Sequence, residues 1–200
     1  MQAGQGVIGH HREDTVFDGV VHVPVDEPAY RVHQDGAAGR VAAWTIGPAA
    51  IGPGKVAVFV GGARWHGHDL REAGFCAYLR EERPNLEVME TIVNLETRQL
   101  THDRYPDVRG IYVAGGGMEG AIAALRQTRA PGEVTLVVNE LTAESHAALA
   151  SRWVTKVSAT SLADLCRTVI GLKTRDGDSA PVADEAQHFL QAQLLVTESI

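Results

Sequence analysis

An arginine, an amide and a carboxylate stand at places where this sequence can bind a hydroxylated molecule. Asn139 and Glu140 directly follow the apolar run 134–138, and Arg71 lies in the first turns of a helical pattern over 69–82. A guanidinium only donates hydrogen bonds, a carboxylate only accepts them, and an amide does both. Together the three groups suit a polyol, which presents donors and acceptors side by side.

The elements that must position Asn139 and Glu140 form one βαβ unit. An apolar run at 111–114 ends in three glycines (115–117), helix formers fill 121–126, and the second apolar run occupies 134–138. Short apolar runs rich in β-branched residues predict buried strands, and a strand–helix–strand unit predicts parallel strands with a right-handed crossover. Ligands of such sheets bind beyond the carboxyl ends of the strands, which places the predicted site at the glycines, Asn139 and Glu140.

The same stretch permits another interpretation. Gly115, Gly117 and Gly120 match the dinucleotide-binding spacing, and Glu140 supplies an acid about 20 residues further on. Against this hypothesis, Glu119 puts a carboxylate at the helix N-terminus, where a pyrophosphate would bind. A dinucleotide-dependent oxidoreductase is thus kept only as an alternative hypothesis. A second alternative is that the glycines form a tight turn that binds no ligand.

A second unit precedes the first along the chain. It comprises a strand at 55–60, a loop with Trp65, a helix at 69–82 and a strand at 86–93. Aromatic and cationic side chains after a strand are typical of a binding loop, so Trp65 is a candidate platform for a sugar ring and Arg71 a candidate hydrogen-bond donor. The alternative is that Trp65 packs under the loop and Arg71 pairs with a helix neighbour.

Further elements complete an α/β pattern. A helix is predicted over 37–46, with Asp35 ahead of it as a cap or, in the alternative, as a ligand contact. The remaining predictions are a helix beginning at 96, a helix over 142–151 capped by Thr142, a strand at 154–157, a helix at 162–172, a polar connector at 173–184 and a strand at 189–196. Their sum is a doubly wound, largely parallel sheet flanked by helices.

Composition excludes several classes of function. The chain has 200 residues, a net charge of −7 and no cluster of lysine and arginine, which argues against a nucleic-acid-binding surface. His10 and His11 have no third ligand at a suitable spacing, so no metal site is predicted. Cys76 and Cys166 lie among helical apolar residues and are expected in the core. With neither a signal-peptide pattern nor an apolar segment of transmembrane length, a cytoplasmic protein without membrane contact is expected.

From residue 37 to its end the sequence resembles the effector-binding domain of LacI-type transcription regulators, which is similar to periplasmic sugar-binding proteins. The likeness rests on a set of motifs in the family's order: Asp35-Gly-Ala-Ala-Gly-Arg-Val-Ala-Ala, Lys55-Val-Ala-Val-Phe-Val-Gly-Gly, Arg71-Glu-Ala-Gly-Phe, Gly110-Ile-Tyr-Val-Ala-Gly-Gly and Val137-Val-Asn-Glu-Leu-Thr. The resemblance implies a periplasmic-binding-protein-like fold of two lobes.

The resemblance also implies roles for particular residues. Arg71 matches an arginine that grips the sugar, and Glu140 matches an acid that accepts hydrogen bonds from sugar hydroxyls. Gly117 falls where many members place Asn or Asp. The candidate ligand-binding set is Arg71, Glu140, Asn139, Trp65, Gly117 and Asp35. The implied function is non-catalytic sensing of a sugar or related small polyol, without a cofactor and with a possible homodimer.

Family members begin with a basic helix-turn-helix headpiece, and residues 1–36 do not fit one. DNA contact is therefore expected only through a headpiece that this chain lacks. The expected division is a disordered start (1–19), a partial first lobe (20–54), an effector-binding lobe (55–172), and a connector with the final strand (173–200). On this interpretation the chain is a truncated regulator, and an inert remnant is the further alternative.

Overall fold

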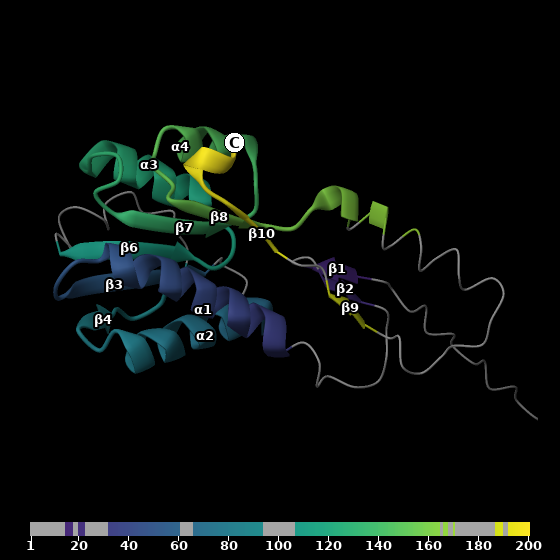
Figure 1. Cartoon of the computed structure of the whole chain (residues 1–200), viewed down its shortest axis with the longest axis horizontal. Helices are drawn as coiled ribbons and strands as arrows, with labels where there is room; N and C mark the ends of the chain where they lie inside the picture. Colours follow the sequence, from purple (N-terminus) through teal and green to yellow (C-terminus); the bar gives the residue numbers. More distant parts are fainter. Residues whose placement is uncertain are drawn as a thin grey trace, which may run out of the picture.

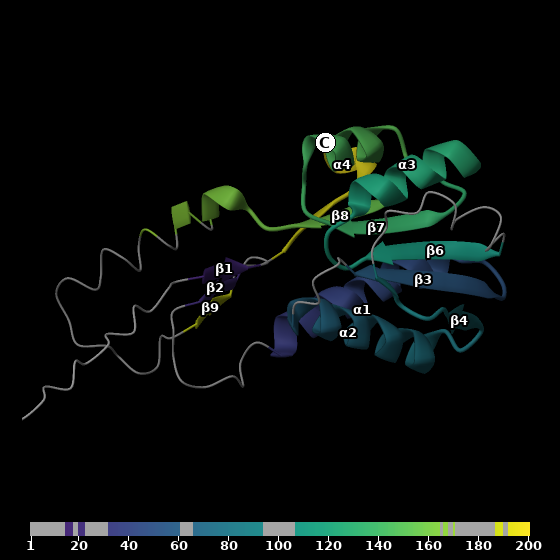
Figure 2. The same cartoon turned by 180° about the vertical axis from the view of Figure 1, so that it is seen from behind.

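A computed structural model of the chain describes residues 15–17, 20–22, 32–60, 66–93, 107–164, 166, 167, 170, 187–189 and 192–200. Its main body is a seven-stranded sheet between two pairs of helices (Figures 1 and 2). This three-layer arrangement is the α/β architecture that the alternation of strand and helix patterns predicts.

The large sheet is parallel except at one edge. Its strands are β3 (Gly54–Val60), β4 (Leu86–Val88), β5 (Ile92–Val93), β6 (Val108–Val113), β7 (Thr135–Asn139), β8 (Lys156–Ala159) and β10 (Gln193–Leu195). They lie in the order β10-β8-β7-β6-β3-β4, with β5 also on β3, and only β10 runs antiparallel to its neighbour. The parallel pairing of β3 with β6 confirms the predicted doubly wound sheet.

The helices cover both faces of this sheet. In Figure 1, α1 (Val32–Ala49) and α2 (His66–Glu82) lie on one side of it, and α3 (Met118–Thr128) and α4 (Ala143–Ala150) on the other. Successive side chains of a strand point to opposite faces. Phe59, Val113 and Val138 accordingly pack in the core under α3 and α4, whereas Val58 and Tyr112 pack in the core under α1 and α2.

The chain changes direction across the sheet between β3 and β6. From β3 it passes outward to β4, and it returns to the other side of β3 as β6, followed by β7 and β8. In open α/β sheets, ligands bind at such a switch point, beyond the carboxyl ends of the strands. The topology therefore directs attention to the ends of β3 and β6.

Two glycines allow α1 and α2 to touch through their backbones. A Cβ added to Gly39 would lie 1.9 Å from the carbonyl oxygen of Arg71, and one added to Gly74 would lie 2.0 Å from that of Gly36. Such distances are far inside van der Waals contact, so larger side chains would push the helices apart. This close approach brings the first turn of α1 beside the middle of α2.

A second, smaller sheet consists of β1 (Thr15–Phe17), β2 (Val20–His22) and β9 (Gln187–Phe189). Both of its pairings, β1 with β2 and β2 with β9, are antiparallel. In Figures 1 and 2 it lies on the side toward which the carboxyl ends of the large sheet's parallel strands point. Residues from the first and last parts of the chain therefore pair in this sheet.

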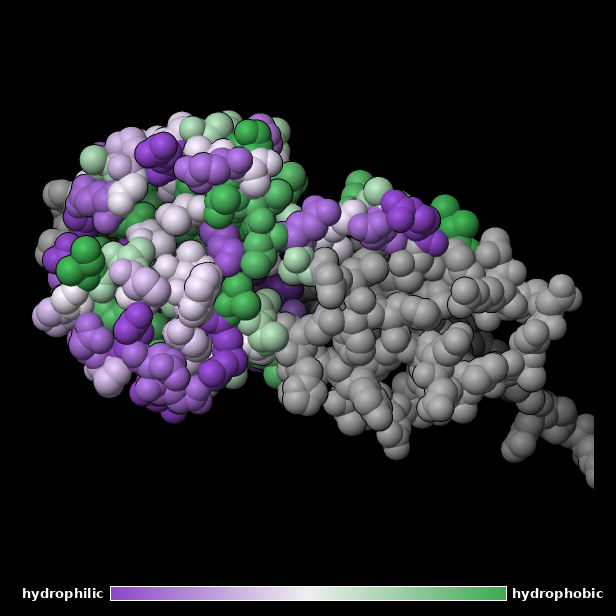
Figure 3. Space-filling model, viewed as in Figure 1, coloured by the Kyte–Doolittle hydropathy of each residue, from purple (hydrophilic) through white to green (hydrophobic). Residues whose placement is uncertain are grey.

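The edge strand β10 carries apolar side chains to the surface. Figure 3 shows hydrophobic residues gathered along the border of the body where β10 runs in Figure 1. Leu194 is 49% exposed, and Val196, which follows the strand, is 39% exposed. The short 3-10 helix η1 (Thr197–Ser199) then turns back onto α4, where Thr197 donates a hydrogen bond to the carbonyl of Leu149.

Several sequence predictions need correction. The strand predicted at 86–93 is two strands, β4 and β5, and the one predicted at 189–196 is divided between β9 and β10 in different sheets. A strand predicted at 154–157 occupies 156–159 instead. Cys166 is exposed and Cys76 half-buried, so the expectation of a core position is wrong for Cys166.

Other predictions are confirmed or fall outside the described residues. Thr142 caps α4 as expected, and every described residue between 162 and 170 is helical. The helix predicted from 96 and the connector at 173–184 lie outside the described part of the chain. The division into lobes stays a prediction. Helix α1, which that division assigns to the first lobe, packs against α2, β6 and β7 of the large body.

Candidate functional site

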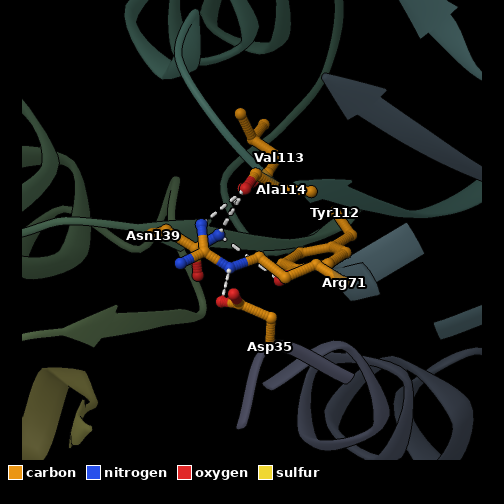
Figure 4. A network of polar contacts seen from close by, with 6 residues as sticks. All are labelled: Asp35, Arg71, Tyr112, Val113, Ala114 and Asn139. Atoms are coloured by element: carbon orange, nitrogen blue, oxygen red, sulfur yellow. Dashed lines mark hydrogen bonds and ion pairs between the residues drawn. The ribbon is translucent and has the colours of Figure 1, made fainter. Parts of the chain in front are cut away.

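Arg71 reaches from α2 to the end of β6 and is nearly buried. Its Nη1 donates a hydrogen bond of 2.8 Å to the carbonyl oxygen of Ala114, and its Nε lies 3.1 Å from Oδ1 of Asp35 on α1 (Figure 4). The side chains of Arg71 and Asp35 are 7% and 15% exposed. A charge so far from water needs a compensating partner, and Asp35 provides it.

Asn139 reaches the same carbonyl from the other side. It is the last residue of β7, and its Nδ2 donates to the Ala114 carbonyl at 2.9 Å. The same nitrogen lies 3.3 Å from the Val113 carbonyl and 3.3 Å from the Tyr112 hydroxyl. One backbone carbonyl just beyond β6 therefore joins α2 to β7, and through Asp35 it is also joined to α1 (Figure 4).

Packing beneath the network fixes its position. Tyr112 is fully buried and stacks on the ring of Phe75, with ring centroids 5.3 Å apart and planes inclined by 20°. Stacked aromatic pairs contribute about 0.5–1.5 kcal/mol beyond the area they bury. Because Phe75 lies four residues after Arg71 on α2, this stack aligns the helix face that carries Arg71 with the end of β6.

A turn of three glycines, residues 115–117, follows Ala114 and connects the end of β6 to α3. A Cβ on Gly115 would lie 2.4 Å from the imidazole of His68, a buried residue of α2, so the ring packs directly on this glycine. Gly117 precedes α3 with φ 98°, a left-handed conformation that favours glycine. An added Cβ on Gly116 meets no atom within 4 Å. The middle glycine therefore has open space beside it.

Glu140 directs its side chain outward. It has φ 74°, which is uncommon for a residue other than glycine, and its backbone nitrogen donates to the Ser158 carbonyl at 2.8 Å. Its own carbonyl accepts a hydrogen bond of 3.0 Å from the Ser145 hydroxyl in the cap of α4. The backbone of Glu140 is thus held by β8 and α4, and its carboxylate is exposed at the same strand end.

The predicted site residues separate into three groups. The structure brings Asp35, Arg71 and Asn139 together around one carbonyl, and it places Gly117 and Glu140 at the neighbouring strand ends. Trp65 lies outside the described residues. The interpretation of Asp35 as a cap is wrong, because α1 begins at Val32 and Asp35 lies within its first turn.

Sequence reasoning missed the centre of the network. The Ala114 carbonyl is a backbone group, so residue type gives no signal for it beyond its position before a glycine turn. Tyr112 sits inside a strand pattern that indicates only packing, whereas His68 belongs to the cationic and aromatic cluster that the sequence predicts as a binding loop. The packing of His68 on Gly115 is visible only when β6 and α2 are placed side by side.

The chemical groups of this network are ones that form hydrogen bonds with a polar ligand. It combines a guanidinium, an amide and a carboxylate at the switch point, with a second carboxylate, Glu140, exposed nearby. Within the described ranges there is no group of three or more His, Cys, Asp or Glu that could hold a metal ion. In the same part of the chain no helix is long and apolar enough to cross a membrane.

A family model described as a periplasmic binding protein domain matches residues 26–170, which is most of the chain. The chain belongs to this family. The matched range begins before α1 and includes the whole hydrogen-bonded network from Asp35 to Asn139. A search of curated protein sequences gave no match.

Several solved structures have a similar fold. An ABC transporter solute-binding protein from Agrobacterium vitis, bound with alpha-D-tagatopyranose, has a TM-score of 0.71 at 21% identity, covering 82% of this chain and 57% of its own. GanP, a glucose-galactose binding protein from Geobacillus stearothermophilus, has a TM-score of 0.68 at 15% identity, with coverages of 84% and 61%.

A solved structure described as a transcriptional regulator is also similar. A putative LacI transcriptional regulator from Bacteroides fragilis has a TM-score of 0.62 at 20% identity, covering 82% of this chain and 60% of its own. At these identities the likeness shows the fold. The chain spans 57–61% of the length of these three structures.

Proposed function

We propose that this periplasmic binding protein domain binds a small sugar or related polyol, without catalysis, at the carboxyl ends of β6 and β7. The observation that carries the proposal is that Arg71 and Asn139 both donate to the Ala114 carbonyl at the topological switch point, while Asp35 accepts from Arg71 beside it. Groups that donate and groups that accept lie together there, as a hydroxylated ligand requires. The sugars named with similar structures, alpha-D-tagatopyranose and D-arabinose, belong to the same chemical class.

We propose further that the sugar is an effector and that the chain is a sensing domain of a LacI-type regulator in the cytoplasm. The order of the Asp35, Arg71 and Val137 motifs supports this hypothesis, as does the similar Bacteroides fragilis structure. A transport-associated solute-binding protein is the second candidate, favoured by the similar ABC transporter structures. Fractionation of cells that make the native protein separates them, since a regulator is recovered with the cytosol and a transport protein outside it.

A thermal-shift screen tests the ligand class. A ligand that binds only the folded state raises the melting temperature, by an amount that grows with its concentration above Kd. Monosaccharides and sugar alcohols are expected to raise it, and NAD is not. Stabilisation by NAD alone would favour the dinucleotide alternative, which uses Gly115, Gly117, Gly120 and Glu140. No response to any of these compounds would favour the inert remnant.

A further inference from the structure

The cation of the candidate site carries its own counter-ion. Arg71 and Asp35 are 3.1 Å apart, and both side chains are more than four-fifths buried. Among the six residues of the network in Figure 4, Arg71 is the single cation and Asp35 the single anion. The pair is therefore close to neutral as seen by a ligand, because the opposite charges act from nearly the same place.

An anionic ligand would need to break this neutrality. To form a charge-assisted hydrogen bond with Arg71, a ligand carboxylate or phosphate must approach Asp35 or displace it from the guanidinium. Displacement would break an ion pair of a nearly buried carboxylate, which is strongly unfavourable. Glu140, exposed at the same strand end, adds a second negative charge. An uncharged hydroxyl can bind beside the pair without either cost.

We propose that Asp35 sets the ligand class of this site, so that it accepts uncharged sugars and rejects sugar acids and sugar phosphates. The inference rests on the proposed sugar-binding function and adds a selectivity to it. Asp35 acts through Arg71, as a residue that determines specificity by repulsion as well as by positioning. A purely structural Asp35 would affect stability and overall affinity, but it would leave the ratio between uncharged and anionic ligands unchanged.

The experiment measures that ratio by isothermal titration of the whole chain with matched ligands. The pairs are glucose with glucuronate, galactose with galacturonate, and glucose with glucose 6-phosphate. The wild-type chain is expected to bind an uncharged sugar with an affinity at least about tenfold higher than that for its anionic partner. A factor of this size corresponds to the loss of one hydrogen bond to a charged group. Asp35→Asn keeps the side-chain shape and removes the negative charge that lies 3.1 Å from Arg71, so the ratio is expected to shift by about tenfold or more toward the anion.

Two controls separate charge from shape. The double variant Asp35→Asn with Arg71→Gln removes both charges, and its ratio is expected to stay near the wild-type value while its affinity falls. The shift caused by Asp35→Asn should largely persist as salt is added, because salt screens charges this deeply buried much less than it screens exposed ones. Circular dichroism reports whether each variant is folded.

The outcomes are distinct. Equal binding of a sugar and its acid by the wild-type chain, or an unchanged ratio in folded Asp35→Asn, overturns the role of Asp35. If Asp35→Asn does not fold, Asp35→Ser removes the same charge, and an unchanged ratio in that variant overturns the role of Asp35 equally. Failure of the wild-type chain to bind any sugar, charged or uncharged, overturns the proposed function itself.

Discussion

Nε of Arg71 lies 3.1 Å from Oδ1 of Asp35 although the two residues are 36 positions apart in the chain. The contact exists because Gly39 and Gly74 let α1 and α2 touch through their backbones. A nearly buried ion pair of this kind links the packing of two helices to the chemistry of one strand end. Its effects on stability and on binding can be measured separately.

Asp35→Ala should destabilise the fold by about 3 kcal/mol, because it removes a carboxylate that pairs with the buried Arg71 guanidinium. Urea denaturation measures the free energy of unfolding. The double variant with Arg71→Ala should lose less than the sum of the single losses, since both single variants break one interaction. Glu81→Ala is the matched control, because it breaks an ion pair with Arg40 in which the Arg40 and Glu81 side chains are 43% and 53% exposed. Loss of such an exposed pair should change the free energy of unfolding little.

Gly74→Ala should separate α1 from α2. The added methyl group would lie 2.0 Å from the Gly36 carbonyl oxygen, and backbone cannot yield as a flexible side chain does. A loss of about 1–3 kcal/mol in stability is expected from this overpacking, together with weaker sugar binding. In the control Gly36→Ala the nearest atom is 3.9 Å away, and stability should be kept or raised by up to about 1 kcal/mol through helix propensity. Equal losses in both variants would contradict the close-contact argument.

Gly117→Ala should cost about 1–2 kcal/mol, because φ at this residue is 98° and a Cβ is strained in the left-handed region. Gly116→Ala, one residue earlier, should change stability by less than about 0.5 kcal/mol, since its added Cβ meets no atom within 4 Å. Thermal unfolding of the two variants is a direct comparison. The idea fails if Gly116→Ala proves the more damaging of the two.

Arg71→Ala should weaken binding of the sugar found in the screen by about tenfold to a hundredfold, the range for a lost hydrogen bond to a charged group. Glu140→Ala should have a smaller effect, because its exposed carboxylate competes with water for the ligand. Isothermal titration measures both affinities, with circular dichroism to confirm folding. Glu144→Ala, which removes an exposed carboxylate paired with Arg126 on α3, should leave affinity unchanged. Unchanged affinity in Arg71→Ala would remove this residue from the site.

The two cysteines should react at different rates. Cys166 is exposed, whereas burial raises the pKa of the Cys76 thiol above its ordinary value. The thiolate is the reactive form, so alkylation of Cys76 should lag behind that of Cys166 and should accelerate only at a more alkaline pH. Mass spectrometry after timed iodoacetamide treatment across a pH series gives both rates. Identical pH profiles would show that Cys76 is not protected in the folded chain.

The sheet could be foreseen largely from local patterns. Strands β3, β6 and β7 are buried on both faces, so each is a continuous apolar run that identifies it without knowledge of its neighbours. Weaker patterns gave wrong predictions. The range 86–93 looks like one strand but contains β4 and β5. The range 189–196 also looks like one strand, but it contributes to β9 and β10, which belong to different sheets. A short apolar stretch does not encode where its hydrogen-bond partner lies.

The sequence predicts where the candidate site residues lie along the strands, and it does not predict their contacts. Sequence order alone put Asn139 and the glycines at strand ends, because the strands that precede them are unmistakable. Only the tertiary structure pairs Asp35 with Arg71, brings Arg71 and Asn139 to the same Ala114 carbonyl, and leaves Glu140 exposed. Hydrophobic periodicity is a property of neighbouring residues. A buried charge finds its partner across the packed helices, and that choice is made by the geometry of the fold.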